Sequence, residues 1–226
     1  MMNPELDWQK IQADIQQGPF FASVVDDFLQ PELLAQYCEC LEHAEGWQTL
    51  DWGEEWQALA HGYQHNLQPK LPNFKKLIAQ LSHHLNLSMW QLVGHFAVKC
   101  LKNRGFLPHA DNAALIVNLW VTPDKYNLLP GKSGMQFWDV QRPTNMPYEM
   151  FTNADYVTQY LKAHSSEVLL NVPYKQNRAI IFDGRTFHQS QPIKFIQSSR
   201  KSMRTSLTLA FDRPYALTQR TIKQRL

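Results

Sequence analysis

Two segments of this chain alternate between a largely apolar face and a mixed face. Only a β-strand puts residues spaced by two on the same side of the backbone. In residues 114–122 the apolar face consists of Leu115, Val117, Leu119 and Val121. The opposite face consists of Ile116, Asn118 and Trp120. A polar residue in the middle of an otherwise apolar face predicts that this face lines a pocket.

Residues 204–211 show the same two-sided pattern near the end of the chain. One face carries Thr205, Leu207, Leu209 and Phe211. The other face is small and polar apart from one arginine, and consists of Arg204, Ser206, Thr208 and Ala210. Small side chains beside an arginine leave room for a bound molecule, and the Arg-x-Ser pair offers a site for a carboxylate.

About seven short strands can be recognised in the sequence without regular helices between them, which favours an antiparallel jelly roll over a parallel doubly wound sheet. The remaining strands are expected at residues 20–28, 89–99, 135–140, 168–172 and 178–182. From Met89 the alternation predicts one face with the side chains of Trp90, Leu92, Phe96 and Val98.

Helical periodicity is strongest in three other stretches. A helix is expected from Pro31 to about His43, a second after a cap at Asn73, and a third after a cap at Asn153. The expected fold class is therefore mainly β with flanking helices (α+β). We expect a double-stranded β-helix, a jelly roll of the cupin-like kind, whose apolar outer faces are covered by N-terminal helices.

The domain organisation follows from these elements. Residues 1–226 are expected to form a single domain, since this length with 44% hydrophobic residues suits one sizeable core. Residues 1–88 are expected to be a mainly helical portion packed on the barrel, with an irregular stretch at 50–72. Residues 89–214 would be the double-stranded β-helix core, and 215–226 a C-terminal tail.

Charge and cysteine content exclude several classes of protein. The net charge of +2 gives no strong field for a membrane or a nucleic acid, so neither is an expected partner. Three cysteines indicate reduced thiols and a cytoplasmic location. The N-terminal residues MMNPELDWQK contain no apolar stretch that would predict a signal peptide.

His109 and Asp111 are the strongest candidates for a chemical function. They lie two residues apart where the pattern predicts a strand or turn, so their side chains can point the same way. With a distant histidine, His188, they can form the 2-His-1-carboxylate set that holds Fe(II) on one face. The pair His43 and Glu45 has the same spacing, but a helix does not put such residues on one face.

Each of these residues also has an ordinary interpretation. His109 could be a hydrogen-bonded core histidine, Asp111 a turn residue, and His188 a loop histidine. The metal site is favoured because the three residues occur in chain order together with two strands that each have a pocket-like face.

These residues resemble the Fe(II)/2-oxoglutarate-dependent dioxygenase superfamily, in particular its prolyl-4-hydroxylase-like branch. The resemblance covers residues 99–214 and rests on the motifs HADN, FHQSQPI and RTSLTLAFD. It implies that His109, Asp111 and His188 are catalytic iron ligands and that 2-oxoglutarate and dioxygen are cosubstrates. Arg204 would hold the distal carboxylate of 2-oxoglutarate with help from Ser206.

The resemblance also implies that Asn118 and Trp120 line the cosubstrate pocket. The sequence departs from the family pattern in two places. The segment between His188 and Arg204 is longer than usual, which leaves Arg200 or Lys201 as alternative anchors for 2-oxoglutarate. The tyrosine often found upstream of the first histidine is absent, and Lys99 or Lys102 lies in that region.

The expected function is an Fe(II)- and 2-oxoglutarate-dependent oxygenase of the hydroxylase type, which releases succinate and carbon dioxide. Its substrate could be a small molecule or a peptide or protein side chain. A cupin-like metalloenzyme without 2-oxoglutarate and a non-catalytic binding or sensor domain on the same fold are the alternatives. Residues 123–153, which are rich in aromatic residues, are expected to form a substrate-side lid.

Overall fold

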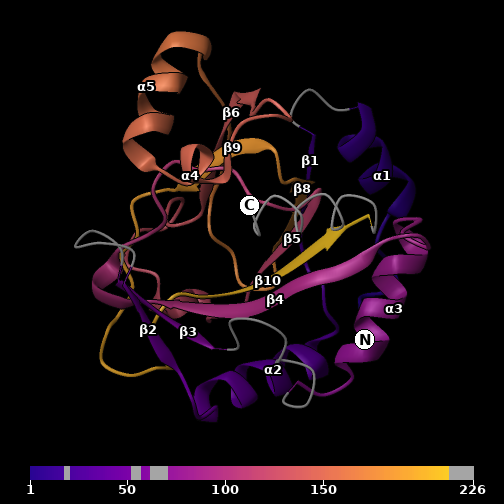
Figure 1. The fold of residues 1–226 in the computed structure, drawn as a ribbon. Helices are drawn as coiled ribbons and strands as arrows, with labels where there is room; N and C mark the ends of the chain where they lie inside the picture. Colours follow the sequence, from indigo (N-terminus) through magenta and orange to yellow (C-terminus); the bar gives the residue numbers. More distant parts are fainter. Residues whose placement is uncertain (18–20, 52–56, 62–70, 214–226) are drawn as a thin grey trace.

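The structure is a computed structural model that describes residues 1–17, 21–51, 57–61 and 71–213 (Figure 1). Within these residues two antiparallel sheets form the framework. The larger sheet has seven strands in the order β1-β8-β5-β10-β4-β3-β2, and the smaller has three in the order β7-β6-β9. The double-sheet architecture expected from the sequence is confirmed. The expected C-terminal tail at 215–226 lies outside the described residues.

The bounds of the strands are as follows. The large sheet contains β1 (Ala22–Val25), β2 (Gln48–Asp51), β3 (Gln57–His61), β4 (Gln91–Cys100), β5 (Leu115–Trp120), β8 (Ala179–Asp183) and β10 (Thr205–Asp212). The small sheet contains β6 (Met135–Gln141), β7 (Val168–Val172) and β9 (Thr186–Ser190).

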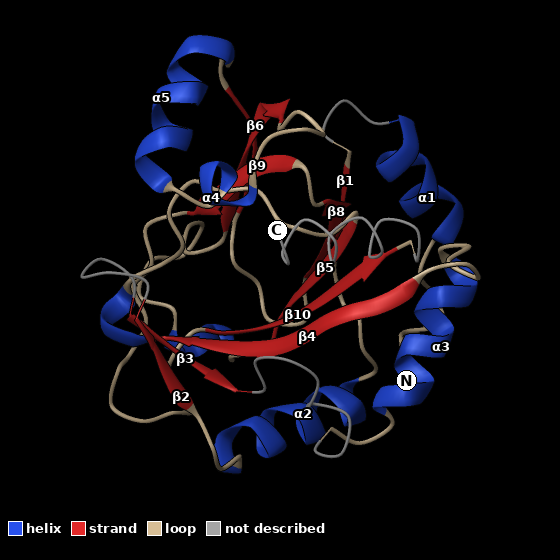
Figure 2. Cartoon of the chain, in the orientation of Figure 1, coloured by secondary structure: helices blue, strands red, loops and turns tan. Residues whose placement is uncertain are grey.

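The helices fall into two groups (Figure 2). The first group is α1 (Trp8–Gln17), α2 (Pro31–His43) and α3 (Phe74–His84), and the second is α4 (Tyr148–Phe151) and α5 (Ala154–His164). Two short 3₁₀ turns are η1 (Leu101–Asn103) and η2 (Asp124–Tyr126). Among the described helices, none combines the length and the apolar character needed to cross a membrane.

Helices α1, α2 and α3 cover the outer face of the large sheet. Their buried side chains, such as Ile11, Tyr37 and Leu77, share one apolar cluster with Val117 on β5 and Leu209 on β10. The largely apolar faces predicted for these two strands therefore pack against the helices. Burial of such a face on helices is the main source of stability in a layered domain.

The mixed faces of β5 and β10 look toward the small sheet. Ile116, Trp120 and Ala210 belong to a second apolar cluster between the sheets, together with Met135 and Phe137 of β6. The two strands are antiparallel neighbours, and Asn118 pairs with Thr208 while Trp120 pairs with Ser206. Their polar residues are thus brought side by side on the inner face, as a pocket requires.

The prediction that Leu92 and Phe96 share one face of β4 is wrong, because a β-bulge interrupts the strand. Ala210 of β10 pairs with Gly94, but its neighbour Phe211 pairs with Leu92, so Val93 is an extra residue. A bulge turns the following side chains to the other face. Leu92 therefore packs in the outer cluster, while Phe96 points to the inner side.

The N-terminal portion is less purely helical than expected. It contributes β1, within the strand expected at residues 20–28, to one edge of the large sheet, and β3 and β2, which were not expected, to the other. Residues 48–51 and 57–61 pair with each other, and β3 also pairs with Ala97–Cys100 of β4. The backbone of β4 has N–H and C=O groups on the side away from β10, and pairing with β3 satisfies them. This long-range partner explains a strand in a stretch without local periodicity.

Candidate metal centre

The segment that carries His109 and Asp111 extends the strand pairing of β9. The N–H of His109 donates to the carbonyl of His188 at 3.0 Å, and the N–H of His188 donates back at 2.9 Å. The N–H of Asp111 donates to the carbonyl of Gly184 at 2.7 Å. In this extended backbone, side chains two residues apart share a face, so His109 and Asp111 project together beside His188.

Gly184 is required for this close approach. A Cβ atom at this position would lie 2.2 Å from the carbonyl oxygen of Ala113 and 3.3 Å from the Cβ of Asp111. The first distance is far below a van der Waals contact with a backbone atom that cannot move aside. A glycine is therefore needed where the chain passes behind the aspartate.

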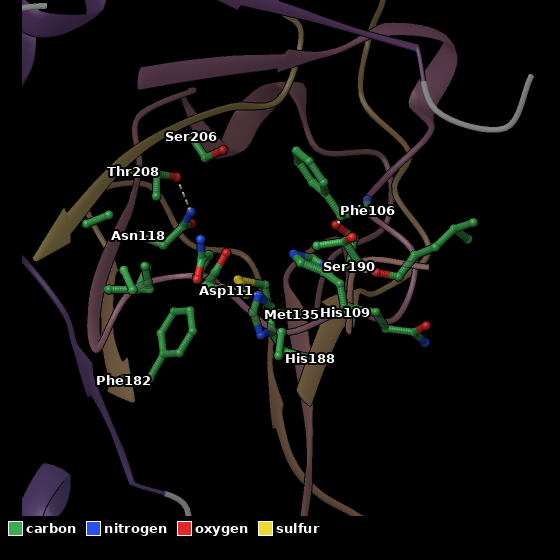
Figure 3. A pocket seen from close by; sticks show the side chains of 18 of the residues that line it. Phe106, His109, Asp111, Asn118, Met135, Phe182, His188, Ser190, Ser206 and Thr208 are labelled. Carbon is green, nitrogen blue, oxygen red and sulfur yellow. Dashed lines mark hydrogen bonds and ion pairs between the residues drawn. The ribbon is translucent and has the colours of Figure 1, made fainter. Parts of the chain in front are cut away.

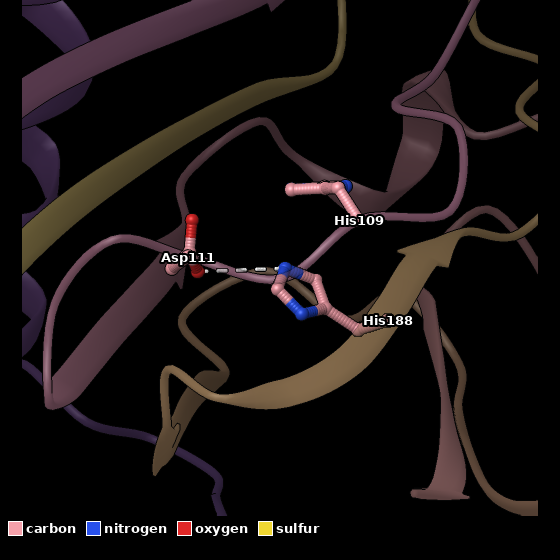
Figure 4. Close-up of side chains that lie close together, drawn as sticks. All are labelled: His109, Asp111 and His188. Atoms are coloured by element: carbon pink, nitrogen blue, oxygen red, sulfur yellow. Dashed lines mark ion pairs between the residues drawn. The ribbon is translucent and has the colours of Figure 1, made fainter. Parts of the chain in front are cut away.

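The three side chains expected to bind a metal do converge (Figure 4). One ligand atom from each of His109, Asp111 and His188 lies within 4.8 Å of the other two. The Nε2 atom of His188 is 3.5 Å from an oxygen of Asp111. Two imidazole nitrogens and one carboxylate at these separations form a donor set that fits Fe(II) or a similar divalent ion.

Hydrogen bonds fix the orientation of both imidazole rings. Nδ1 of His109 lies 2.7 Å from the carbonyl oxygen of Leu107, and Nδ1 of His188 lies 2.9 Å from that of Thr186. A carbonyl can only accept, so Nδ1 of each ring is the donor in this bond, and Nε2 is the ring nitrogen left for a metal. Metal-binding histidines are typically oriented by such a bond at the second nitrogen.

The protonation states also suit a metal. Burial, with a smaller contribution from the neighbouring His109, lowers the pKa of His188 well below its usual value. Burial raises the pKa of Asp111, while the charges of His109 and Arg142 act in the opposite direction. Bringing a cation between these groups removes the desolvation penalty on the carboxylate and uses the neutral form of the imidazole.

The three side chains open into a cavity of about 730 Å³, which is within the range of small-molecule pockets. Figure 3 shows Ser206, Thr208 and Asn118 gathered along one wall of this cavity, beside the His109, Asp111 and His188 side chains. The amide nitrogen of Asn118 donates to Thr208 Oγ1 at 2.9 Å. Among the described residues, the buried Oδ1 atom of Asn118 has no hydrogen-bond partner.

Arg204 lies in the wall of the same cavity and is almost fully buried. Its Nε donates to the carbonyl oxygen of Ser133 at 2.8 Å, and its Nη1 donates to the sulfur of Cys100 at 3.6 Å. The guanidinium lies 5.3 Å from the ring centre of Trp120 and 5.9 Å from that of Tyr174. Among the described residues, no aspartate or glutamate forms an ion pair with Arg204. An anionic ligand would therefore complete the site.

The carbonyl that faces Arg204 comes from a constrained turn. Ser133 is fully buried and has a left-handed φ of 66°. Its hydroxyl donates to Asn127 Oδ1 at 3.0 Å and accepts from the N–H of Lys194 at 3.2 Å. These bonds offset the cost of a conformation that non-glycine residues seldom adopt, and they fix the position of the carbonyl.

The alternative anchors lie elsewhere. Arg200 is exposed, and Lys201 forms an ion pair with Glu42 at 3.3 Å. Lys99 is on the outer face of the large sheet, where its ammonium lies 5.1 Å from the ring centre of Trp47, and Lys102 is exposed. Neither lysine is among the residues that line the cavity.

Trp120 is placed differently from the expectation. It is fully buried and stacks on Tyr174 with ring centres 5.1 Å apart, and it is not among the residues that line the cavity. Its indole lies behind the guanidinium of Arg204, so it supports the arginine and does not contact the cavity itself. The alternation of β5 correctly predicted that the Trp120 side chain points between the two sheets. Because the indole ring is large, it packs in the second apolar cluster.

The expected lid reaches the cavity through Met135 of β6 and through its last part, residues 148–153. Tyr148 and the residues Thr152, Asn153, Ala154 and Asp155 line it, whereas Tyr126 packs against the core between the sheets. The middle of residues 123–153 is β6, the central strand of the small sheet. The predicted cap at Asn153 is confirmed, because its side chain accepts a bond from the N–H of Tyr156.

Among the residues that sequence reasoning missed are Ser133, which contacts Arg204, and Arg142, which contacts Asp111. Neither residue belongs to a periodic pattern, and each contacts a site residue that is far away in the chain. The Lys-Ser-Gly sequence at 132–134 is a turn signal, but it does not indicate which side chain its carbonyl will meet.

Comparisons with known proteins show a similar fold without a detectable sequence relationship. No model of a protein family matches the chain, and no curated protein matches it by sequence. Solved structures do match. The epimerase SnoN from nogalamycin biosynthesis, in complex with Fe3+, alpha ketoglutarate and nogalamycin RO, has a TM-score of 0.64 at 14% identity, over 91% of this chain and 83% of that chain.

Two further structures support the same fold. A 2OG-Fe(II) oxygenase family oxidoreductase from Burkholderia pseudomallei has a TM-score of 0.56 at 12% identity, over 94% of this chain and 93% of that chain. A prolyl-4-hydroxylase from Pseudomonas putida has a TM-score of 0.52 at 14% identity, over 91% and 98% of the two chains. The resemblance stated from the motifs is thus confirmed at the level of the fold, the double-stranded β-helix of 2-oxoglutarate oxygenases.

Proposed function

We propose that this protein is an Fe(II)- and 2-oxoglutarate-dependent oxygenase that oxidises a C–H bond and releases succinate and carbon dioxide. One observation carries the proposal. A single cavity contains both the His109, Asp111 and His188 set and the buried guanidinium of Arg204. A metal site by itself fits many enzymes, but a buried arginine in the same cavity fits a cosubstrate with two carboxylates.

The three ligand residues would hold the iron on one face and leave its remaining positions directed into the cavity. When bound, Fe(II) and 2-oxoglutarate supply the reactivity toward dioxygen and toward the substrate. The protein contributes orientation. The carbonyls of Leu107 and Thr186 hold the imidazoles with Nε2 toward the ion, and the pairing between His109 and His188 keeps the two rings at a fixed separation.

Arg204 would bind the distal carboxylate of 2-oxoglutarate, and Ser206 would donate a hydroxyl hydrogen bond to it. The bonds to Ser133 and Cys100 use two N–H groups of the guanidinium, which leaves others of its five for a ligand. The flat rings of Trp120 and Tyr174 limit rotation of the guanidinium plane. Such preorganisation reduces the entropy that binding would otherwise cost.

The substrate would enter past the end of α4 and the start of α5. Tyr148, Thr152 and Asp155 line the cavity there and offer hydroxyl and carboxylate groups. We propose a small molecule as the substrate, with a peptide side chain as the second candidate. SnoN, which has a similar fold, is described as an epimerase, and its structure contains nogalamycin RO. The carboxylate of Asp111 in the ligand set favours hydroxylation or a related oxidation over halogenation.

The test is an incubation of Fe(II)-loaded protein with 2-oxoglutarate and oxygen, in which succinate is measured over time. Slow succinate formation without a substrate supports the proposal, because oxygenases of this kind turn over their cosubstrate at a low rate alone. A cupin-like metalloenzyme would bind iron but form no succinate, and a binding domain would do neither. Screening compounds that accelerate succinate formation would then identify the substrate class.

A further inference from the structure

The metal-ligand segment is held on its other side by residues from α4. The N–H of Ala110, between the two candidate ligands, donates to the carbonyl oxygen of Phe151 at 3.0 Å. Phe151 is the last residue of α4 and is buried, as is Ala110. The first residue of the same helical turn, Tyr148, lines the cavity. One short turn thus contacts both the cavity and the backbone of the metal-ligand segment.

Arg142, which directly follows β6, connects these two parts. Its side chain is buried, and its Nε and Nη2 atoms each lie 3.3 Å from the backbone carbonyl oxygen of Asp111. Its guanidinium lies 4.2 Å from the centre of the Phe151 ring. The N–H of Arg142 donates to the carbonyl of Arg185 at 2.8 Å, which anchors its backbone to the turn before β9.

We propose that Arg142 is a positioning residue that fixes the backbone of Asp111 and fastens it to α4. The inference rests on the proposed metal centre. The carboxylate of Asp111 lies 3.5 Å from Nε2 of His188. The Arg142 guanidinium binds the backbone carbonyl of Asp111 and so limits rotation of the peptide that carries the ligand. Groups that orient a metal ligand in this way typically contribute about 10–100-fold to metal affinity.

A purely electrostatic role would have the opposite sign. A guanidinium near a divalent cation repels it, so loss of the charge alone would strengthen metal binding. Loss of the positioning bonds would weaken it. The direction of the change in metal affinity therefore distinguishes the two roles.

The experiment compares Arg142→Met and Arg142→Lys with the wild-type protein. Mn(II) is titrated into each protein, and free ion is followed by its electron paramagnetic resonance signal, while melting temperature is measured without metal. Methionine keeps much of the apolar contact with Phe151 but has no donors. Lysine keeps the charge but cannot reproduce the two-pronged contact. We expect Arg142→Met to weaken Mn(II) binding about tenfold or more, with Arg142→Lys recovering only part of the loss.

Arg178→Met is the matched control. Arg178 also uses its guanidinium to bind a backbone carbonyl, that of Pro173 at 2.7 Å, and it pairs with Asp26 away from the cavity. This variant should keep wild-type metal affinity. If Arg142→Met does not fold, Phe151→Leu replaces it, because it keeps the carbonyl that binds Ala110 and removes the ring under the guanidinium. Weaker Mn(II) binding by Phe151→Leu and Arg142→Lys would then support the inference.

The possible results separate this inference from the proposed function. Unchanged or tighter Mn(II) binding by the Arg142 variants, with a wild-type protein that binds one ion, overturns the positioning role alone. Equal weakening by Arg178→Met would also overturn it, since the effect would then follow general destabilisation. A wild-type protein that binds no Mn(II) overturns the metal centre and with it both proposals.

Discussion

His109 and His188 pair through their backbones in both directions, and each donates its N–H to the carbonyl of the other. Their ring centres lie 4.4 Å apart. Two histidines that are distant in the sequence are thereby fixed as neighbours by main-chain bonds. Because main-chain bonds hold the two segments together, substitution of a candidate ligand side chain should change metal binding without rebuilding the fold.

The first prediction concerns the ligands themselves. His109→Ala, Asp111→Ala and His188→Ala should each abolish stoichiometric Fe(II) binding, because two ligands cannot hold the ion as three do. Calorimetric titration of metal into the apo protein measures this. His43→Ala is the control, since His43 is the exposed last residue of α2. A ligand variant that retains wild-type iron affinity would remove that residue from the set.

The second prediction separates the cosubstrate from the metal. Arg204→Met should weaken 2-oxoglutarate binding by about 2–5 kcal/mol, because a buried carboxylate would lose its charged partner. Binding of Fe(II) should change little. Affinity for 2-oxoglutarate is measured by titration into metal-loaded protein, with Arg200→Ala as the exposed control. Greater damage from Arg200→Ala would place the anchor outside β10.

The third prediction concerns the substrate side. Tyr148 lines the cavity and is 54% exposed, whereas Tyr126 packs against the core. Tyr148→Ala should reduce oxidation of the substrate but spare the slow succinate formation that needs no substrate. Tyr126→Ala should mainly lower the melting temperature. If Tyr148→Ala reduces both activities equally and lowers the melting temperature as well, α4 is a structural element only.

The fourth prediction uses the pH dependence of stability. Burial lowers the pKa of Lys99 from 10.5 to about 8, and its ammonium donates to Thr205 Oγ1 and to the carbonyl of Arg200. Between these two pH values the unfolded chain binds more protons at this residue than the folded one. Stability contributed by Lys99 should therefore rise with pH across this window.

The measurement is the free energy of unfolding in denaturant for wild type and Lys99→Met at pH 7, 8.5 and 10. The difference between the two proteins should move in favour of wild type as pH rises, by at most about 3 kcal/mol. Other lysines and tyrosines titrate equally in both proteins and cancel in the difference. A difference that does not change with pH would show that Lys99 titrates normally in the fold.

Much of this fold could be predicted because short stretches of the sequence indicate its strands and helices. The alternation in β5 and β10 depends only on the period of a strand, and each apolar face must be buried whatever the neighbours are. The two-sided strands, the cap at Asn153 and the chain order of His109, Asp111 and His188 could therefore be predicted from the sequence, whereas the side chain of Asn73 makes no capping bond. The same reasoning indicated Arg204 over Arg200, because Arg204 directly precedes the alternating strand β10.

Other features depended on partners far away in the chain. The extra residue Val93 reverses the face of β4 only because β10 pairs across it. Residues 48–51 and 57–61 become strands because they pair with each other and with β4, and no periodicity of their own indicated this.

The sequence by itself determined which faces of β5 and β10 are apolar and which three residues could bind a metal. Only the tertiary structure decided that Trp120 supports Arg204 from behind, that Ser133 presents its carbonyl to the same arginine, and that Arg142 binds the carbonyl of Asp111. The physical reason is that these contacts are made by single side chains and carbonyls across the fold. They leave no period or motif in the chain, and they form only when packing brings the segments together.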